Sequence, residues 1–167
     1  IYALMAVSLV LVFAVTRVIF IAQGEFVSFG ALTFAMMADG RLPQTIYLLP
    51  IIGAIIFFKE LYFYFKGRHG LGLHWSFVYF IALPLALMFL IPEILALEPN
   101  IWVKALLSIV IVVPLGPMLY RLVFEPIAEA SSLVLLIVSI ALHFAMVGAG
   151  LVMFGAEGWL VSEPFFD

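Results

Sequence analysis

The sequence contains no cysteine and few charged residues. The absence of cysteine excludes a disulfide framework, a thiolate metal site and a cysteine nucleophile. Only 10% of the 167 residues are charged and 67% are hydrophobic, whereas a soluble domain has roughly a quarter and about half, respectively. This composition excludes a water-soluble globular domain. Seven Lys and Arg residues with a net charge of -3 provide no basic face for phosphates, which excludes nucleic-acid binding.

The apolar residues occur in long runs of helical length. A spanning helix needs about 20 mainly apolar residues, whereas the strands of a membrane barrel alternate over about ten. Short charged or Pro- and Gly-rich separators divide the chain into six such runs, so we predict an all-α, polytopic transmembrane helix bundle with antiparallel neighbours. The six predicted spans are residues 1–16, 18–38, 45–66, 75–97, 101–122 and 132–154. Prolines inside several of these runs predict kinks.

The beginning of the chain indicates a fragment. At 1.5 Å per residue the first run is about 24 Å long, shorter than a hydrocarbon core of about 30 Å, and it opens on Ile1 rather than Met. We therefore expect residues 1–167 to form a single membrane-embedded domain that is truncated at both ends.

The basic residues predict an orientation. If the loop that carries Lys66 and Arg68 faces the cytoplasm, strict alternation of the spans places most of the positive charge inside. The inner residues are then Arg17, Lys59, Lys66, Arg68 and Arg121, and the outer ones are Arg41 and Lys104. Lys59 and Glu60 lie about two turns inside the third span, where we expect snorkelling or a local ion pair near the interface.

A polar group interrupts the second predicted span. Gln23, Gly24 and Glu25 are followed by Ser28 in an otherwise apolar run. Counted from Arg17, Glu25 lies about 12 Å deep, where a carboxylate normally faces a bundle interior or a watered cavity. The adjacent glycine predicts a helix break, and a half-helix starting at Glu25 would place its carboxylate at the positive end of the helix dipole. Two roles remain open, a pathway residue or a structural cap that bonds a neighbouring helix.

A second polar stripe follows the last predicted span. Ser132, Ser139, His143 and Gly150 are separated by seven, four and seven residues, which places them on one helix face. This face is expected to pack against protein, with His143 bonding Ser139 or a partner helix, or else to line a pathway. A haem or metal site is disfavoured because no second intramembrane histidine and no acidic cluster accompany His143 in the sequence.

Several catalytic signatures are missing from the sequence. There is no Gly-rich loop ending in Lys-Ser/Thr, so this chain does not hydrolyse ATP alone. Gly-x-Ser-x-Gly and His-Glu-x-x-His are absent as well, which lowers the odds of an intramembrane hydrolase or zinc protease.

Two separated blocks resemble the branched-chain amino-acid ABC transporter permeases. The first comprises residues 2–4 (YAL), 18–26 (VIFIAQGEF) and 30–31 (GA). The second comprises residues 120–126 (YRLVFEP), 130–133 (ASSL) and 137–140 (IVSI). Residues 20–22 read Phe-Ile-Ala where the family usually has Asn-Phe-Ala. Residues 44–97 look longer than the usual member by an extra pair of hydrophobic segments.

The resemblance implies a multi-pass permease subunit of the bacterial inner membrane. It implies import of branched-chain or other hydrophobic amino acids, with a second permease subunit, a periplasmic substrate-binding protein and ATP-binding subunits as partners. The chain itself would hold no cofactor and perform no chemistry, since ATP is bound by the partner subunits. The residues expected along the translocation pathway are Gln23, Gly24, Glu25, Ser28, Ser139 and His143.

Two other functions compete with the importer. In a secondary transporter or channel-like protein, Glu25 would itself be a proton or cation site. In a non-transporting membrane subunit, the polar stripes would serve assembly alone.

Overall fold

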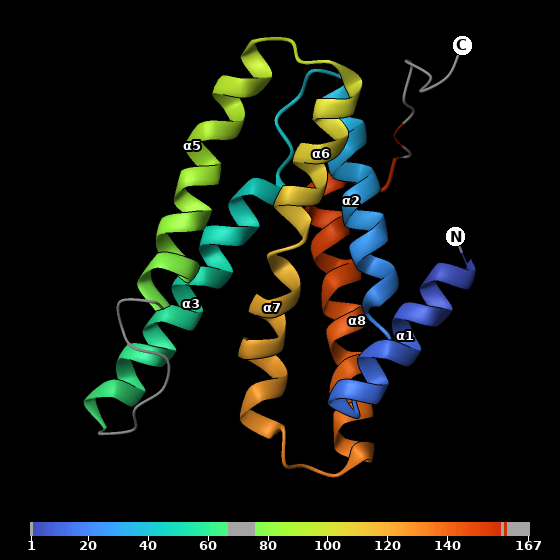
Figure 1. Ribbon diagram of the computed structural model, residues 1–167, viewed down its shortest axis with the longest axis vertical. Helices are drawn as coiled ribbons and strands as arrows, with labels where there is room; N and C mark the ends of the chain where they lie inside the picture. Colours follow the sequence, from blue (N-terminus) through green and yellow to red (C-terminus); the bar gives the residue numbers. More distant parts are fainter. Residues whose placement is uncertain (1, 67–75, 158, 160–167) are drawn as a thin grey trace.

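The computed structural model describes residues 2–66, 76–157 and 159. Within these residues every regular element is a helix and no strand occurs (Figure 1). The α-helices are α1 (Tyr2–Thr16), α2 (Gln23–Ala38), α3 (Thr45–Phe65), α5 (Leu83–Ala96), α6 (Ile101–Val112), α7 (Leu115–Leu119) and α8 (Ser132–Phe154). Two π-helical segments, η1 (Val78–Ala82) and η2 (Tyr120–Phe124), and a 3₁₀ turn, η3 (Glu125–Ile127), complete the elements.

Four helical stretches are long and apolar enough to cross a membrane: Thr45–Phe65, Val78–Ala96, Ile101–Ile127 and Ser132–Phe154. The all-helical fold and a chain compatible with membrane spanning are therefore confirmed. The predicted bounds of the last span agree with α8, and those of the third span differ from α3 by one residue. Residues 1 and 75, at the starts of two predicted spans, and Arg68 lie outside the described residues.

The first helix is as short as predicted, and the second is shorter than its predicted span of 18–38. α1 has 15 residues and α2 has 16, which correspond to about 22 and 24 Å, less than the core thickness of about 30 Å. The second span loses its first five residues because residues 18–22 are not helical. The prediction that a helix begins at residue 18 is wrong, since α2 begins at Gln23. Six helices of spanning length are thus not confirmed.

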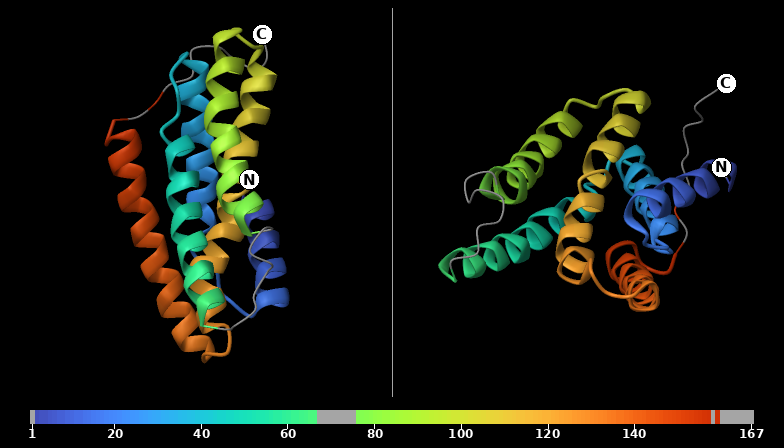
Figure 2. Two further views of the ribbon diagram at one scale, coloured as in Figure 1. Left: turned by 90° about the vertical axis from the view of Figure 1, so that its left-hand side faces the viewer. Right: turned by 60° about the horizontal axis from the view of Figure 1, so that its bottom comes forward.

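The helices form a bundle in which consecutive elements alternate in direction (Figures 1 and 2). α2, α5 and α8 run one way, and α3 and the α6–η2 stretch run the other. Lys59 of α3 and Arg121 of η2 meet at one end, where the Lys59 Nζ lies 2.6 Å from the Arg121 carbonyl oxygen. We call this the basic end. Gly40, Glu98 and Lys104 come together at the opposite end.

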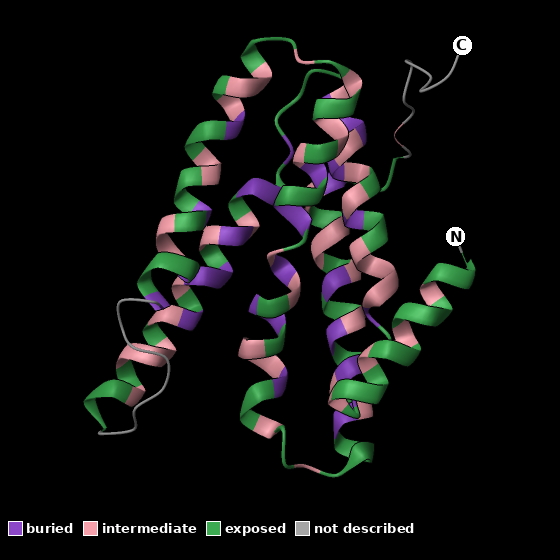
Figure 3. Ribbon diagram, in the orientation of Figure 1, coloured by how far each residue is buried: buried purple, intermediate pink, exposed green. Residues whose placement is uncertain are grey.

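The core lies where α2, α3, α6, α7 and α8 meet, and the outward faces are exposed apolar surface (Figure 3). Leu49, Ile111 and Leu115 are fully buried, whereas Phe58, Phe144 and Val152 are exposed. Large exposed apolar side chains along helices of spanning length are what contact with lipid or with another membrane subunit requires.

A glycine permits the closest approach between α3 and η1. A Cβ atom added to Gly53 would lie 1.8 Å from the Phe80 carbonyl oxygen and 3.1 Å from the Met118 Cε. Such close contact of backbones is typical of small residues in membrane helices.

The predicted kinks are confirmed at one proline in particular. α6 ends at Val112 and α7 begins at Leu115, so the helix is interrupted at Pro114. Pro50 and Pro92 lie inside α3 and α5, which continue through them.

The adjacent charges Lys59 and Glu60 pair with other elements rather than with each other. The Arg121 Nη2 lies 2.8 Å from the Glu60 Oε1, and Lys59 lies 3.6 Å from Glu125. Arg121 and Glu60 are 13% and 11% exposed. The expected local ion pair is therefore a network that ties α3 to η2 and η3 at the basic end, because successive residues of a helix point in different directions.

Candidate functional site

The polar site begins with a break in the chain between α1 and α2. Arg17 has φ 56°, a left-handed conformation that ends α1, and residues 17–22 leave backbone groups without helical partners. The Ile21 N–H donates to the Ser139 Oγ of α8 at 2.8 Å. Ser139 is fully buried. This predicted pathway residue therefore satisfies one backbone N–H of the break.

Gln23 and Gly24 face α1. The Gln23 Nε2 donates to the Met5 carbonyl oxygen at 2.9 Å, and the Ser8 hydroxyl donates to the Gln23 Oε1 at 3.2 Å. A Cβ atom on Gly24 would lie 3.6 Å from the Met5 Cε. These two residues join α1 to the first turn of α2, away from α8.

Glu25 faces α8 and meets His143. The Glu25 Oε1 lies 3.2 Å from the His143 Nδ1, and the side chains are 18% and 32% exposed. The separation is that of an ion pair when the histidine is protonated, and the buried Nδ1 has no hydrogen-bond partner among the described residues. Glu25 also lies in the first turn of α2, where the helix dipole favours its negative charge. α2 starts at Gln23, two residues before the start predicted at Glu25.

The pair lies at the middle of the longest single α-helix. α8 runs from Ser132 to Phe154, 23 residues, so His143 is its central residue, and its length of about 34 Å matches a hydrocarbon core of about 30 Å. In a bilayer centred on α8, Glu25 and His143 would therefore be near the midplane. Ionisable groups at this depth are costly and generally functional.

A groove of about 210 Å³ runs from Glu25 along α2 and α8 to the end of α8 away from the basic end. Ser28 and Leu32 line it from α2, and Val147 and Leu151 from α8. Beyond α8 it reaches Glu157. The groove is therefore an apolar slot with a carboxylate at each end.

Aromatic and small side chains hold the walls of this groove together. The rings of Phe29 and Phe154 meet edge to face with centroids 5.7 Å apart. A Cβ atom on Gly150 would lie 3.6 Å from the Phe29 ring, so the glycine allows α2 and α8 to lie close. Of the predicted stripe on α8, His143 and Gly150 face α2 and Ser139 faces the irregular segment before it, whereas Ser132 is exposed.

The structure brings together Glu25 and His143, which lie far apart in the sequence. Glu25 approaches His143 across 118 positions of the chain, a contact that neither local sequence contains. His143 contacts a partner helix, as one of the two expectations stated, and Ser139 is occupied by Ile21 instead. Of the six predicted pathway residues, Glu25 and Ser28 line the groove.

The chemistry available in the groove is the binding of charge. Glu25 offers an anionic oxygen to a cation or a proton, and His143 can accept or release a proton next to it. The described residues contain no group of three or more His, Cys, Asp or Glu side chains suited to a metal ion.

Comparison with known proteins identifies no relative. No protein-family model matches the chain, and neither the curated proteins nor the solved structures gave a significant match.

Proposed function

We propose that the chain is a membrane permease subunit of an ATP-driven importer for branched-chain or other hydrophobic amino acids. The observation that carries the proposal is the position of Glu25, which lies in the first turn of α2 and at the inner end of an apolar groove. Broken helices whose ends face a central site are a recurrent arrangement in transporters.

The groove suits an amphipathic solute. The Glu25 carboxylate would attract an ammonium group, and the apolar side chains of Leu32, Val147 and Leu151 would contact an aliphatic side chain. The resemblance of residues 18–26 and 120–126 to amino-acid permeases points to the same solutes. In this proposal a second permease subunit covers the exposed side of the groove, two subunits bind ATP, and a binding protein delivers the solute to a bacterial inner membrane.

Cysteine labelling tests whether the groove carries water. The chain has no native cysteine, so Ser28→Cys in the groove and Ala145→Cys on the exposed face of α8 form a matched pair. We expect a charged, membrane-impermeant thiol reagent to modify Ser28→Cys and to leave Ala145→Cys unmodified in native membranes. Protection of Ser28→Cys from reagent added on both sides would overturn the pathway.

Reconstitution tests the energy source. We expect the chain to co-purify with a nucleotide-binding subunit, and vesicles that contain the complex to accumulate leucine only with ATP. Glu25→Gln is expected to reduce uptake at least tenfold, and Glu93→Gln, on an exposed position of α5, to leave it unchanged. Uptake by the purified chain without ATP or partners would overturn the importer.

The close approach of Glu25 and His143 favours one alternative, a secondary transporter or channel-like protein with a proton site at this pair. This alternative predicts that a pH gradient alone drives uptake. Glu25→Gln would then abolish the dependence of uptake on the gradient. Uptake by the unsubstituted protein that is the same with and without a pH gradient would exclude the alternative.

A further inference from the structure

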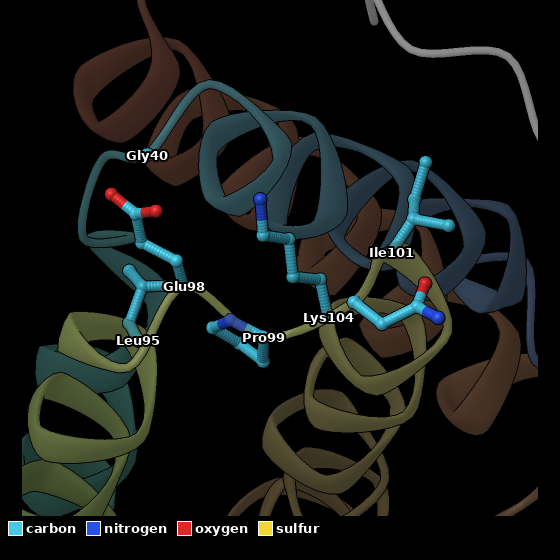
Figure 4. Close-up of a pocket in the computed structure, with 7 residues that line it drawn as sticks. Gly40, Leu95, Glu98, Pro99, Ile101 and Lys104 are labelled. Atoms are coloured by element: carbon cyan, nitrogen blue, oxygen red, sulfur yellow. The ribbon is translucent and has the colours of Figure 1, made fainter.

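A second cavity lies far from Glu25, at the end opposite the basic end. It has a volume of about 460 Å³ and lies between the loop after α2, which contains Gly40, and the α5–α6 connection (Figure 4). Leu95, Pro99 and Ile101 provide apolar contact area. Glu98 and Lys104 contribute opposite charges to the same space.

The two charges are free to bind a ligand. Figure 4 shows the Glu98 and Lys104 side chains extending along two sides of the pocket towards the level of Gly40. They form no ion pair with each other or with another described residue, whereas the nearby Arg41 and Asp39 pair at 3.0 Å. A ligand that satisfies both groups carries a positive group towards Glu98 and a negative group towards Lys104.

The backbone at Glu98 supplies an independent observation. Glu98 has φ 48°, the left-handed conformation in which glycine or asparagine normally ends a helix. It also precedes Pro99, and residues before proline favour φ near about -120°. Strain of this kind is retained at positions where it places a functional group. Here it places a carboxylate at the edge of the pocket.

We propose that this pocket binds a zwitterion, with a primary ammonium group at Glu98 and a carboxylate or phosphate at Lys104. Two sources share this chemistry, a free amino acid and the headgroup of phosphatidylethanolamine. The proposal goes beyond the importer function, because it assigns a binding site to the surface of this chain that requires neither the groove at Glu25 nor ATP.

The test measures binding to the full chain in lipid nanodiscs on a Glu25→Gln background, so that binding in the groove does not contribute. In phosphatidylcholine nanodiscs, leucine is expected to bind at least tenfold more tightly than isopentylamine or 4-methylpentanoate, which each lack one charge. In mixed nanodiscs, native mass spectrometry counts retained phosphatidylethanolamine and its displacement by leucine. Binding of leucine alone identifies the free amino acid, and retention of phosphatidylethanolamine alone identifies the lipid.

Charge variants decide whether the pocket is responsible. Glu98→Gln and Lys104→Gln are each expected to weaken binding at least tenfold, whereas Glu93→Gln, outside the pocket, leaves it unchanged. The double reversal Glu98→Lys with Lys104→Glu is expected to bind more tightly than either single reversal, because a zwitterion can turn around. Glu98→Gly is expected to lose binding while its thermal midpoint stays or rises, since glycine tolerates the positive φ.

Several outcomes would overturn the proposal. These are binding of neither ligand, equal binding of the singly charged analogues, or unchanged binding in Glu98→Gln and Lys104→Gln. A drop in the thermal midpoint of Glu98→Gly would show that the backbone at Glu98 is not strained. Failure here would leave the importer intact, because ATP-driven uptake through the groove depends on Glu25.

Discussion

Gly53 lies directly against the carbonyl oxygen of Phe80, which a Cβ atom at position 53 would approach to 1.8 Å. The obstacle is backbone, so a larger residue must push η1 away from α3. We predict that Gly53→Ala lowers the free energy of unfolding by about 1–3 kcal/mol. Thermal unfolding in detergent measures this.

Gly148→Ala is the matched control. A Cβ atom there meets nothing within 4 Å, so we expect no loss, or a gain up to about 1 kcal/mol from the higher helix propensity of alanine. Equal losses at both positions would show that Gly53 is not a packing site.

A buried hydroxyl pair joins α2 to α3. The Oγ1 atoms of Thr33 and Thr45 lie 2.8 Å apart, and both residues are fully buried. We predict a coupling free energy of about 0.6 kcal/mol in a double-mutant cycle with valine. Thr16→Val, whose hydroxyl bonds its own helix, should show no coupling to Thr45→Val.

We expect the ion pair between Glu60 and Arg121 at the basic end to contribute more to the free energy of unfolding than exposed charges nearby. Removing Glu60 leaves a largely buried guanidinium whose remaining ion pair is the longer one of 3.6 Å to Glu125, beside its contact with the Phe80 ring. We therefore predict that Glu60→Gln lowers the free energy of unfolding by about 3 kcal/mol. Glu129→Gln, at an exposed position, should change it by less than about 0.5 kcal/mol. The ion-pair assignment fails if the two variants unfold alike.

The contact between Glu25 and His143 has a spectroscopic consequence. Replacing the imidazole changes the environment of the carboxylate 3.2 Å away. We predict that His143→Gln shifts the infrared carboxylate band that Glu25→Gln identifies, while Glu157→Gln does not disturb that band. An infrared band of Glu25 that stays at the same frequency in His143→Gln would mean that the two groups do not interact.

The spans could be predicted from sequence because their determinants are local. α8 begins after Ser131, whose hydroxyl accepts from the Val134 N–H, and ends at Gly155 with φ 78°. Both signals lie within a few residues of the helix ends. Apolar composition between them is sufficient to predict the helix.

The break before α2 could be predicted only in part. Gly24 and Glu25 indicated an interruption, but residues 18–22 (VIFIA) are compatible with a spanning helix. What keeps them out of the helix includes the Ser139 hydroxyl, which belongs to an element more than a hundred residues later. The contact between Glu25 and His143 could not be predicted for the same reason, because the two residues belong to elements that are far apart in the sequence.

The bond between Ser139 and residue 21 joins a side chain to a main chain, and the two positions therefore differ in what they tolerate. The peptide N–H at position 21 is present for every amino acid except proline, so the Ile21 side chain can drift among apolar types without disturbing the break. Position 139 has no such freedom, because a buried hydroxyl there must be supplied by the residue itself. Among related chains, variation should accumulate on the irregular segment, while the serine that faces it stays fixed.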